Sequence, residues 1–528
     1  MNDLIIVGAG TAGCVLAERL SSSGRLRVTL IEAGGKPASP FVKIPAGFAK
    51  LFKSKLDWDF ESEPQTAANG RRVFTPRGKM LGGSSNMNAQ IHQWCHPADF
   101  DEWTAAGASG WGWEEVAPIF REQECWLGDD GDGARGRKGP MLVSPNKNAH
   151  RLSKAFVEAA RAAGLGNQPS YNGDAFEGAW LTELAHKDGQ RFSAFDAYLK
   201  PAMQRANLEV VREAQVLRVE ISNGRATGVT VQQGGVEKTF SARGVILAAG
   251  AFGSPQVLML SGIGQAAALK QFGIPVYYDA PEVGANLQDH PLIPVIFSTR
   301  GTDTLKKAES PMSLLRYLLF KRGMLASNAV EAMAFTHSSG VKGTPPDIEL
   351  ILAPFQWNNQ GLEAPQVDAV SIGVAVVAPR SRGSLRLRSA NPLDAPLIDF
   401  GLLTDPEGKD AAATLAGARL ARKIATVSPL ADLVGKEIFP GADVTEDAEL
   451  LAQLTSQIQT VYHPTSTCRM GSDPRAVVDP QLQVRGAEGL WVVDASVMPA
   501  VPRGHPNAVV AMIANRAAGI IASKIAAS

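Results

Sequence analysis

Short apolar runs alternate with a glycine-rich turn over the first thirty residues of the chain. Residues 4–7 and 28–31 are apolar runs of strand length, and residues 11–23 carry apolar side chains at helical spacing. Strand, turn, helix and strand in this order predict a βαβ unit, which requires two parallel strands in one sheet.

The middle of the chain carries strand patterns of two kinds. Residues 207–233 alternate between apolar and polar positions, which predicts antiparallel strands, and the apolar run 245–249 predicts a buried strand. From residue 292 to 454, strand-like runs such as IELILA alternate with helical stretches at 312–319 and 410–425. We expect a second domain built on a sheet of its own there.

The remaining segments are two long loops and a C-terminal strand and helix. Residues 34–85 and 126–146 are rich in glycine, proline or aspartate and show no periodic pattern. Long loops of this kind are usually functional, so we expect an excursion or lid near a site. Residues 490–493 predict a strand, and a helix over about 507–527 closes the chain.

Composition and charge exclude some partners. Of the 528 residues, 45% are hydrophobic and 20% are charged, which is normal for a globular protein with a sizeable core. Lysine and arginine balance aspartate and glutamate, 52 against 52. This balance gives no sign of attraction to nucleic acid or to an anionic membrane surface.

Cysteine usage and the chain start bear on the compartment. Cys14, Cys95, Cys125 and Cys468 are scattered without ligand spacing, which predicts reduced thiols and no metal site. The first strand leaves no room for a signal peptide before it. The chain contains no run of about 18 apolar residues, so we expect no transmembrane helix. We expect a cytoplasmic protein.

The first turn has the GxGxxG pattern between a strand and a helix, and an acid closes the next strand. Such glycines permit a tight turn and close approach of a pyrophosphate, which the helix N-terminus attracts, while the acid accepts hydrogen bonds from a ribose. The pattern alone does not separate NAD from FAD. The predicted dinucleotide contacts are Gly8, Gly10, Thr11, Ala12, Gly13 and Glu32.

Five further segments resemble signature patterns of the glucose-methanol-choline (GMC) family of FAD-dependent oxidoreductases. They follow one another in family order along nearly the whole chain. Several are long, which makes the resemblance specific. The segments are Gly78–Asn88, Gly250–Gly264, Pro281–His290, Tyr462–Gly471 and Trp491–Pro499.

The resemblance implies an α/β fold in which a Rossmann-like FAD-binding domain is interleaved with a sheet-based α+β substrate domain. It assigns residues 1–155, 200–300 and 455–528 to the FAD domain. Residues 156–199 and 301–454 then form the substrate domain. By motif position, it also places FAD contacts at Gly82, Asn88, Val216, Asp494 and Ala495.

The sequence departs from the family patterns at four positions. His92 stands where the first signature has an aromatic residue or alanine, and Cys95 where it has a small residue or proline. Met87 replaces the histidine that links flavin covalently in choline oxidases, so we expect non-covalent FAD. Ser466 replaces a glycine in the segment around His463.

Two histidines, His463 and His505, are the candidate catalytic residues. The resemblance implies that the first faces flavin and substrate, and that the second position is histidine or asparagine across the family. A base with a pKa near neutrality can remove a hydroxyl proton, and a second donor can hold the forming alkoxide. We assign the base to His463 and the orienting role to His505, with reversed roles as the alternative.

The residues next to His505 and three others complete the predicted site. If Asn507 caps the last helix, its N-terminus would favour the anionic reduced flavin, so Pro506 and Asn507 join the FAD contacts. In choline-type relatives an acid near Glu331 faces a cationic head group; an acid bonded within the sheet is the alternative. The candidate substrate-pocket residues are Glu331, Trp357, which could equally pack in the core, and Tyr462.

These features predict an FAD-dependent GMC alcohol oxidase or dehydrogenase acting on CH–OH groups. The expected conversion is a small or medium primary alcohol to an aldehyde, with proton abstraction at the histidine pair and hydride transfer to flavin N5. Oxygen or another acceptor reoxidises the flavin. The alternatives are a choline- or sorbose-type dehydrogenase of the same family and a non-redox, FAD-containing hydroxynitrile lyase. The retained histidine pair argues against a flavin-binding protein without activity.

Overall fold

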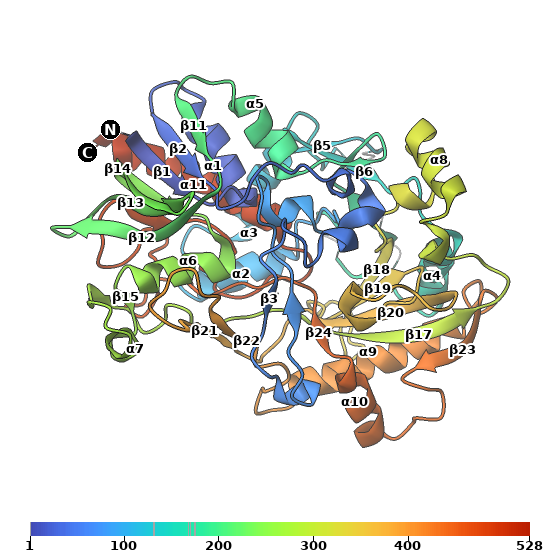
Figure 1. Cartoon of the computed structure of the whole chain (residues 1–528). Coiled ribbons are helices and arrows are strands. Elements are labelled where there is room, and N and C mark those ends of the chain that lie inside the picture. The colour runs from blue at the N-terminus through green and yellow to red at the C-terminus, as the bar shows by residue number, and fades with distance from the viewer. Residues whose placement is uncertain (1, 130–132, 167, 169, 174–175, 528) are drawn as a thin grey trace.

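Two seven-stranded sheets organise the chain (Figure 1). The computed structural model describes residues 2–129, 133–166, 168, 170–173 and 176–527. In Figure 1 the first sheet lies at the upper left beside both termini, and the second lies at the lower right. The predicted mixed α/β architecture, with a parallel-containing sheet and an antiparallel sheet, is confirmed.

The first sheet contains the predicted βαβ unit. Its strand order is β11-β2-β1-β14-β13-β12, with β25 paired to β14. The strands β11, β2, β1, β14 and β25 run parallel, and β12, β13 and β14 form an antiparallel extension. The strands are β1 (Asn2–Val7), β2 (Val28–Ile31), β11 (Leu208–Val211), β12 (Ala214–Ser222), β13 (Arg225–Gln233), β14 (Val236–Leu247) and β25 (Leu490–Val492).

One strand of this sheet differs from the prediction. We expected only antiparallel strands over 207–233, but β11 pairs parallel with β2. Its alternating pattern arises because β11 is the edge strand, so one of its faces stays partly exposed, as for Glu209. An edge strand has the same alternation whether its single neighbour is parallel or antiparallel.

The second sheet is antiparallel throughout. Its order is β23-β17-β20-β19-β18-β7, with β24 paired to β17. Its strands β17 and β24 lie within the ranges 200–300 and 455–528, which the resemblance assigns to the FAD domain. The strands are β7 (Gly178–Leu181), β17 (Pro291–Thr299), β18 (Ala332–Thr336), β19 (Ile348–Ala353), β20 (Ala369–Val376), β23 (Val434–Phe439) and β24 (Gln459–Thr460).

Helices pack against both sheets. On the first sheet α1 packs against α11, and on the second sheet α4 and α9 pack on β18, β19 and β20. The α-helices are α1 (Thr11–Ser21), α2 (Pro97–Ala105), α3 (Trp113–Gln123), α4 (Arg151–Ala162), α5 (Lys200–Ala202), α6 (Gly250–Leu260), α7 (Ala266–Gln271), α8 (Pro311–Phe320), α9 (Lys409–Ala425), α10 (Asp447–Ser456) and α11 (Asn507–Ala527).

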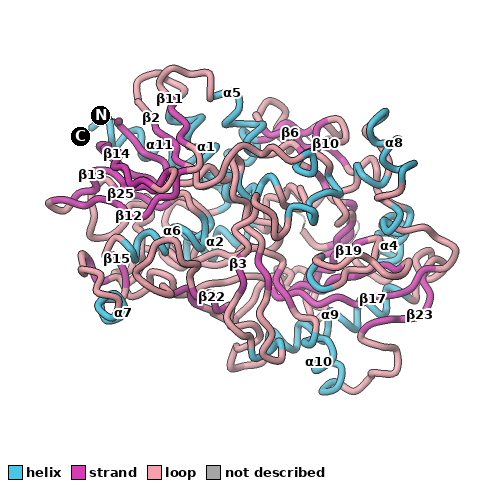
Figure 2. The backbone as a smooth tube through the Cα atoms, in the orientation of Figure 1, coloured by secondary structure: helices cyan, strands magenta, loops and turns pink. Residues whose placement is uncertain are grey.

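Loop backbone fills much of the space between the sheets (Figure 2). The predicted loop 34–85 runs there, and its short elements include the 3-10 helices η2 (Pro45–Leu51) and η4 (Gly83–Asn86). The other short strands are β3 (Phe60–Glu61), β4 (Phe74–Thr75), β5 (Glu124–Trp126), β6 (Met141–Pro145), β8 (Glu183–Leu184), β9 (His186–Lys187), β10 (Gln190–Arg191), β15 (Ile263–Gly264), β16 (Tyr278–Asp279), β21 (Ser384–Arg386) and β22 (Leu397–Asp399).

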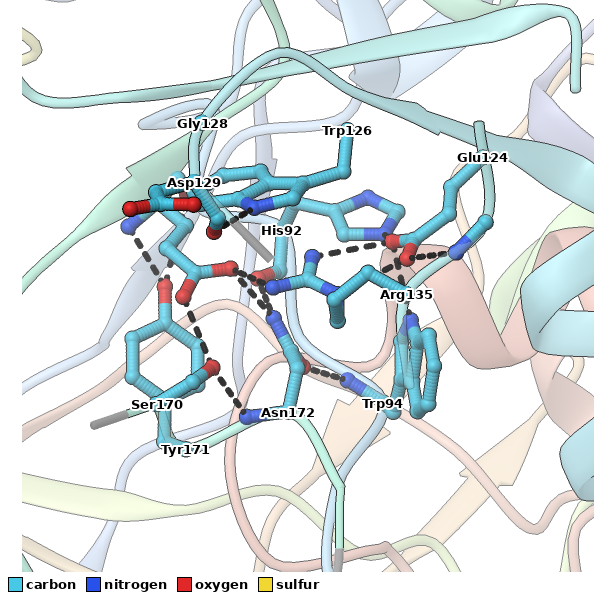
Figure 3. Close-up of polar contacts among 12 residues, drawn as sticks. His92, Trp94, Glu124, Trp126, Gly128, Asp129, Arg135, Ser170, Tyr171 and Asn172 are labelled. Atoms are coloured by element: carbon cyan, nitrogen blue, oxygen red, sulfur yellow. Dashed lines mark hydrogen bonds and ion pairs between the residues drawn. The ribbon is translucent and has the colours of Figure 1, made fainter. Parts of the chain in front are cut away.

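A buried network of charged residues holds the second predicted loop, residues 126–146, against the rest of the fold (Figure 3). The Arg135 guanidinium binds Glu124 at 2.8 Å and Glu183 at 2.7 Å, and His92 Nε2 lies 3.1 Å from the Glu124 carboxylate. Although burial alone would raise it, hydrogen bonds from His92 and Arg135 lower the pKa of Glu124 to about 2. The unusual His92 therefore belongs to this network, which ties the excursion after β5 to the fold. Residues 130–132 of that loop lie outside the described part.

The C-terminal helix is apolar and packs inside the molecule. By length and composition alone its stretch Asn507–Ala526 could span a membrane, but 56% of the window is buried within the protein. Its end lies beside the chain start, because Arg243 pairs with Asp3 at 3.3 Å and donates to the Ile525 carbonyl at 2.9 Å. Both ends therefore meet at the first sheet (Figure 1).

Candidate active site

A large cavity lies between the two sheets and is lined from both. Fifteen of the eighteen residues predicted for the site line it. The exceptions are Gly13, Gly82 and Glu331. The predicted lining residues are Gly8, Gly10, Thr11, Ala12, Glu32, Asn88, Val216, Trp357, Tyr462, His463, Asp494, Ala495, His505, Pro506 and Asn507.

The turn between β1 and α1 forms one end of this cavity. Gly8 has φ +96°, and a Cβ atom there would lie 2.6 Å from the Ala248 carbonyl oxygen, so only glycine fits. A Cβ atom on Gly10 would meet no atom of the described chain within 4 Å. Among the described residues no side chain caps α1, so its N-terminal amides can face an anion in this open space. The turn therefore fits a dinucleotide pyrophosphate.

Two predicted glycine contacts lie behind the cavity wall. A Cβ atom on Gly13 would lie 1.9 Å from the Gly8 carbonyl oxygen, so Gly13 serves the contact between helix and turn. Gly82 has φ +95°, and a Cβ atom there would lie 2.3 Å from Asn86 Nδ2. Its neighbours Gly83 and Ser84 line the cavity instead. Gly82 thus shapes the turn and is not itself a lining residue.

Glu32 lines the same end of the cavity as the Gly8–Gly10 turn. It accepts hydrogen bonds from the amides of Ala9 and Gly34, both at 2.8 Å. Burial raises the pKa of Glu32 to about 6. Each carboxylate oxygen has a further lone pair, so both can accept from ribose hydroxyl groups while holding the turn. Glu32 and the Gly10 turn together fit the adenosine half of FAD.

The N-terminus of α11 also lines the cavity, but Asn507 does not cap it. The helix begins at Asn507, and Val510 donates to the Pro506 carbonyl at 2.9 Å, which puts Pro506 at the capping position. The Asn507 side chain instead accepts a hydrogen bond from the Thr11 hydroxyl at 2.7 Å. Asn507 therefore joins the N-termini of α11 and α1.

His463 and His505 lie beside each other in the cavity wall, between the cofactor end and the end that faces the second sheet. Their ring centroids are 4.9 Å apart and the ring planes lie at 85°. His463 is held by its amide, which donates to Asp289 at 2.8 Å, and His505 by its amide, which donates to Gln93 at 2.9 Å. Burial, followed by the nearby His505, His290 and Arg77, lowers the pKa of His463 well below its usual value. His463 is therefore neutral and able to accept a proton.

A third histidine extends the pair into a row. His290 Nδ1 lies 3.1 Å from His463 Nδ1, so one of these atoms donates to the other. Burial lowers the pKa of His290 to about 3, which keeps it neutral. Asp289 accepts from the amides of both His290 and His463 through one oxygen atom, each at 2.8 Å. Neither His290 nor Asp289 is predicted as a catalytic residue from the sequence.

The residue most clearly missed is Glu349. Its carboxylate lies 2.9 Å from His505 Nε2, and its side chain is fully buried. A carboxylate has no proton to donate, so His505 Nε2 donates to Glu349. The contact with Glu349 does not involve the other ring nitrogen, Nδ1. Glu349 interrupts the apolar strand IELILA. Because glutamate is almost never fully buried without a partner, that interruption was the available signal.

The cavity end that faces the second sheet is mainly apolar, although Ser371, Gln459 and Thr460 also line the cavity. Leu292, Pro294, Val330, Ile351 and Ala353 line it together with Trp357 and Tyr462. The predicted pocket residue Glu331 is absent from this lining, which corrects its assignment. Its carboxylate is fully buried and accepts from Ser153 at 2.6 Å, Ser327 at 2.5 Å and the His150 amide at 2.7 Å. Glu331 therefore serves the packing of α4 on the sheet.

Ser466, which replaces a glycine of the family pattern, has a backbone conformation that is unusual for serine. Ser466 has φ +75°, a left-handed conformation that favours glycine. Its amide donates to the Ala495 carbonyl at 3.2 Å, and its hydroxyl donates to Thr465 at 3.0 Å. The turn after His463 thus keeps a glycine geometry with a serine in it.

Comparisons with known proteins agree with this layout. Residues 2–292 and 379–514 match the two parts of the GMC oxidoreductase family pattern. The chain is 40% identical to an alcohol dehydrogenase [acceptor] of Pseudomonas putida over 99% of this chain and 96% of that protein. It is 39% identical to an oxygen-dependent choline dehydrogenase of Sinorhizobium fredii, again over 99% and 96%. The structure of pyridoxine 4-oxidase from Mesorbium loti superposes with a TM-score of 0.91 at 32% identity, covering 98% of this chain and 99% of that one.

Proposed function

Because the chain belongs to the GMC oxidoreductase family, we propose that it oxidises an uncharged primary alcohol to an aldehyde at the histidine pair. FAD is the cofactor typical of this family. When bound, FAD supplies the acceptor for the hydride that leaves the carbinol carbon. The observation that carries the proposal is a neutral His463 beside His505 in a cavity with two parts. One part is the end at the Gly8–Gly10 turn, which fits a dinucleotide. The other is the end that faces the second sheet, which we call the apolar chamber.

The two histidines divide the work on the hydroxyl group. In this proposal His463 Nδ1 carries the ring proton and donates to His290, which leaves the unprotonated Nε2 of His463 to take the hydroxyl proton as a general base. His505 is held by Glu349 through Nε2, so its Nδ1 edge is left for the substrate oxygen. In this proposal both ring nitrogens of His505 carry a proton, so that Nε2 donates to Glu349 and Nδ1 donates to the substrate oxygen. The proton therefore goes to His463, and the oxygen that loses it is held by His505.

The chemistry of the chamber favours an uncharged substrate. Apart from Glu32 and Asp494 at the cofactor end, no carboxylate is among the described residues that line the cavity. A quaternary ammonium group would be desolvated there without a counter-charge, and only aromatic faces such as those of Trp357 and Tyr462 would offset that cost. Of the two relatives above, the alcohol dehydrogenase of Pseudomonas putida agrees better with this lining than the choline dehydrogenase does, so we favour an uncharged alcohol over choline.

The side chain of Met87 supports binding of FAD without a covalent bond. It lines the cavity where a covalent link would require a nucleophilic side chain, and a thioether forms no stable bond of that kind. We propose that FAD is held without a covalent bond. Acid precipitation should then leave all yellow colour in the supernatant, and flavin retained in the pellet would contradict the proposal.

The decisive experiment is anaerobic mixing of the holoprotein with a panel of alcohols. Short and medium aliphatic alcohols and benzyl alcohol should bleach the flavin absorbance, and choline and sorbose should not. Oxygen uptake and dye reduction with the best alcohol then identify the acceptor. Failure of every alcohol to bleach the flavin, together with cleavage of a cyanohydrin, would replace this proposal with a lyase.

A further inference from the structure

The surface helix α8 exposes an unusual number of apolar side chains. It spans ten residues, of which only Tyr317 is buried. Large apolar side chains this exposed are uncommon in a cluster, and a contiguous patch of them marks an interaction surface. The exposed fractions are Met312 72%, Leu314 44%, Leu315 50%, Leu318 57%, Leu319 64% and Phe320 66%.

The helix stands on a narrow base. Tyr317 anchors it, with its hydroxyl donating to the Gly189 carbonyl at 3.4 Å. Gly189 also contacts Lys321 closely, since a Cβ atom on Gly189 would lie 2.1 Å from the Lys321 carbonyl oxygen. In Figure 1 α8 projects from the upper right of the molecule, away from both sheets. Its apolar side chains therefore point outward in several directions around the helix.

Basic residues surround this apolar surface. Lys306 and Lys307 precede the helix, and Lys321 and Arg322 follow it, while Arg316 lies on the helix itself. Lys307 pairs with the exposed Asp303 at 2.6 Å, and Glu309 is the other acid between residues 303 and 322. Although the whole chain is electrically balanced, this segment therefore has a clear basic excess.

We propose that α8 is a docking surface for an anionic lipid bilayer. Its apolar side chains would enter the boundary between headgroups and acyl chains, and the flanking lysines and arginines would meet the lipid phosphates. Long basic side chains such as Arg316 can keep their charge at the headgroup level while their stems stay apolar. On the cytoplasmic location that we propose, the inner leaflet supplies the anionic lipids.

The shape of the surface separates this partner from a second copy of the chain. A protein partner covers one face of a helix, but the exposed side chains of α8 extend around it, leaving only the side at Tyr317 buried. Lipid can surround such a helix on all of its exposed sides. A second copy would also bring the same basic residues face to face, which is unfavourable.

The base of α8 is continuous with the wall of the active-site cavity. Leu305 and Ala308, just before the helix, pack with Phe48 in one apolar cluster, against which Trp357 also packs. Phe48 and Trp357 line the cavity. Docking would therefore bring the apolar chamber close to the lipid, where apolar alcohols concentrate. This last step rests on the proposed function, but the docking itself does not.

The test is vesicle co-sedimentation of the full-length holoprotein. We expect binding to vesicles of phosphatidylcholine with phosphatidylglycerol, and much weaker binding to phosphatidylcholine alone. L315S/L319S should weaken binding by about tenfold or more, because two leucines no longer enter the lipid. K306Q/R322Q should weaken binding to the anionic vesicles by about tenfold and leave the residual binding to neutral vesicles unchanged.

The matched control is V341S/L393S, which removes two apolar side chains of similar exposure elsewhere on the surface. This control should bind like the wild type, and all variants should keep FAD and Tm because the altered positions are exposed. Equal binding of L315S/L319S and wild type, or no binding of wild type to either vesicle, would overturn the proposal. A wild-type dimer in light scattering that L315S/L319S converts to a monomer, without vesicle binding, would replace lipid with a second copy. Neither outcome bears on alcohol-dependent flavin bleaching, so the proposed function is tested separately.

Discussion

The two ends of the active-site cavity are built by different means. At the cofactor end the contacts come from backbone: the turn at Gly8 and Gly10, the free N-terminus of α1 and the amides that hold Glu32. At the substrate end they come from side chains that point inward from the antiparallel sheet, such as Ile351 and Ala353. Backbone sites require fixed residue types at fixed spacing, but a side-chain wall accepts many combinations.

The histidine pair lies where the two ends meet, and each histidine is supported by a different kind of partner. His463 is held by Asp289 in a turn that belongs to a sequence motif. His505 is held by Glu349 from β19, which belongs to no motif. We therefore expect variants of His463 and His505 to lower the rate of flavin reduction directly. Variants of Glu349 should lower that rate by misplacing the His505 ring, and variants of Glu32 should weaken the binding of FAD.

The largest expected effect is that of His463→Ala. Loss of the general base should lower the anaerobic rate of flavin reduction by about 10²–10⁴-fold, with FAD still bound. Because burial lowers the pKa of His463, the wild-type rate should stay high as the pH falls to 6.5 and drop only below it. Stopped-flow absorbance measures both quantities, with the half-exposed His337→Ala as a control. An unchanged rate in His463→Ala would assign the base elsewhere.

Replacing His505 should separate orientation from proton uptake. His505→Ala removes the donor to the substrate oxygen and should lower flavin reduction by about 10²–10³-fold. His505→Asn keeps a donor and should retain much of the activity, because asparagine can hydrogen-bond but cannot take up the proton. Equal and near-complete loss in both variants, with FAD bound, would make His505 the base.

Glu349→Gln should have an intermediate effect through His505. An amide can still accept from Nε2, but it orients the ring less strongly than a carboxylate, so we expect a decrease of about 10–100-fold in flavin reduction. The same change in a His505→Asn background should have little effect, which a merely structural role would not produce. Glu331→Gln is the matched control, since it alters a second fully buried acid, whose partners are Ser153, Ser327 and the His150 amide and not His505. Additive losses in the double variant would contradict positioning.

The smallest effect on chemistry should come from Glu32→Ala at the cofactor end. It removes an acceptor for the ribose and a partner of two backbone amides, so FAD affinity should fall by about 1.5–3 kcal/mol. The rate of flavin reduction in protein refilled with FAD should be close to wild type. Fluorescence titration of the deflavinated protein measures the affinity, with exposed Glu209→Ala as the control. Unchanged affinity would show that Glu32 supports the turn alone.

The sequence predicted the cofactor end better than the substrate end, for the same physical reason. A pyrophosphate turn needs glycine at positions such as Gly8, so the chemistry is visible as a spacing. Glu331, just before β18, and Glu349, in β19, are both acids in apolar segments, and only tertiary structure shows that one bonds to serines and the other to His505. The strand β11 was assigned the wrong direction because edge exposure produces the same alternation in parallel and antiparallel sheets.

The meeting of the two chain ends at Arg243 has a practical consequence for handling the enzyme. In the view of Figure 1 the ends lie at the upper left and α8 at the upper right. An affinity tag or an electrode linker at either end would therefore leave α8 and the cavity unobstructed. A short peptide could also join the ends, and the chain could be reopened at the exposed hairpin tip Gly234–Gly235 to give a circular permutant.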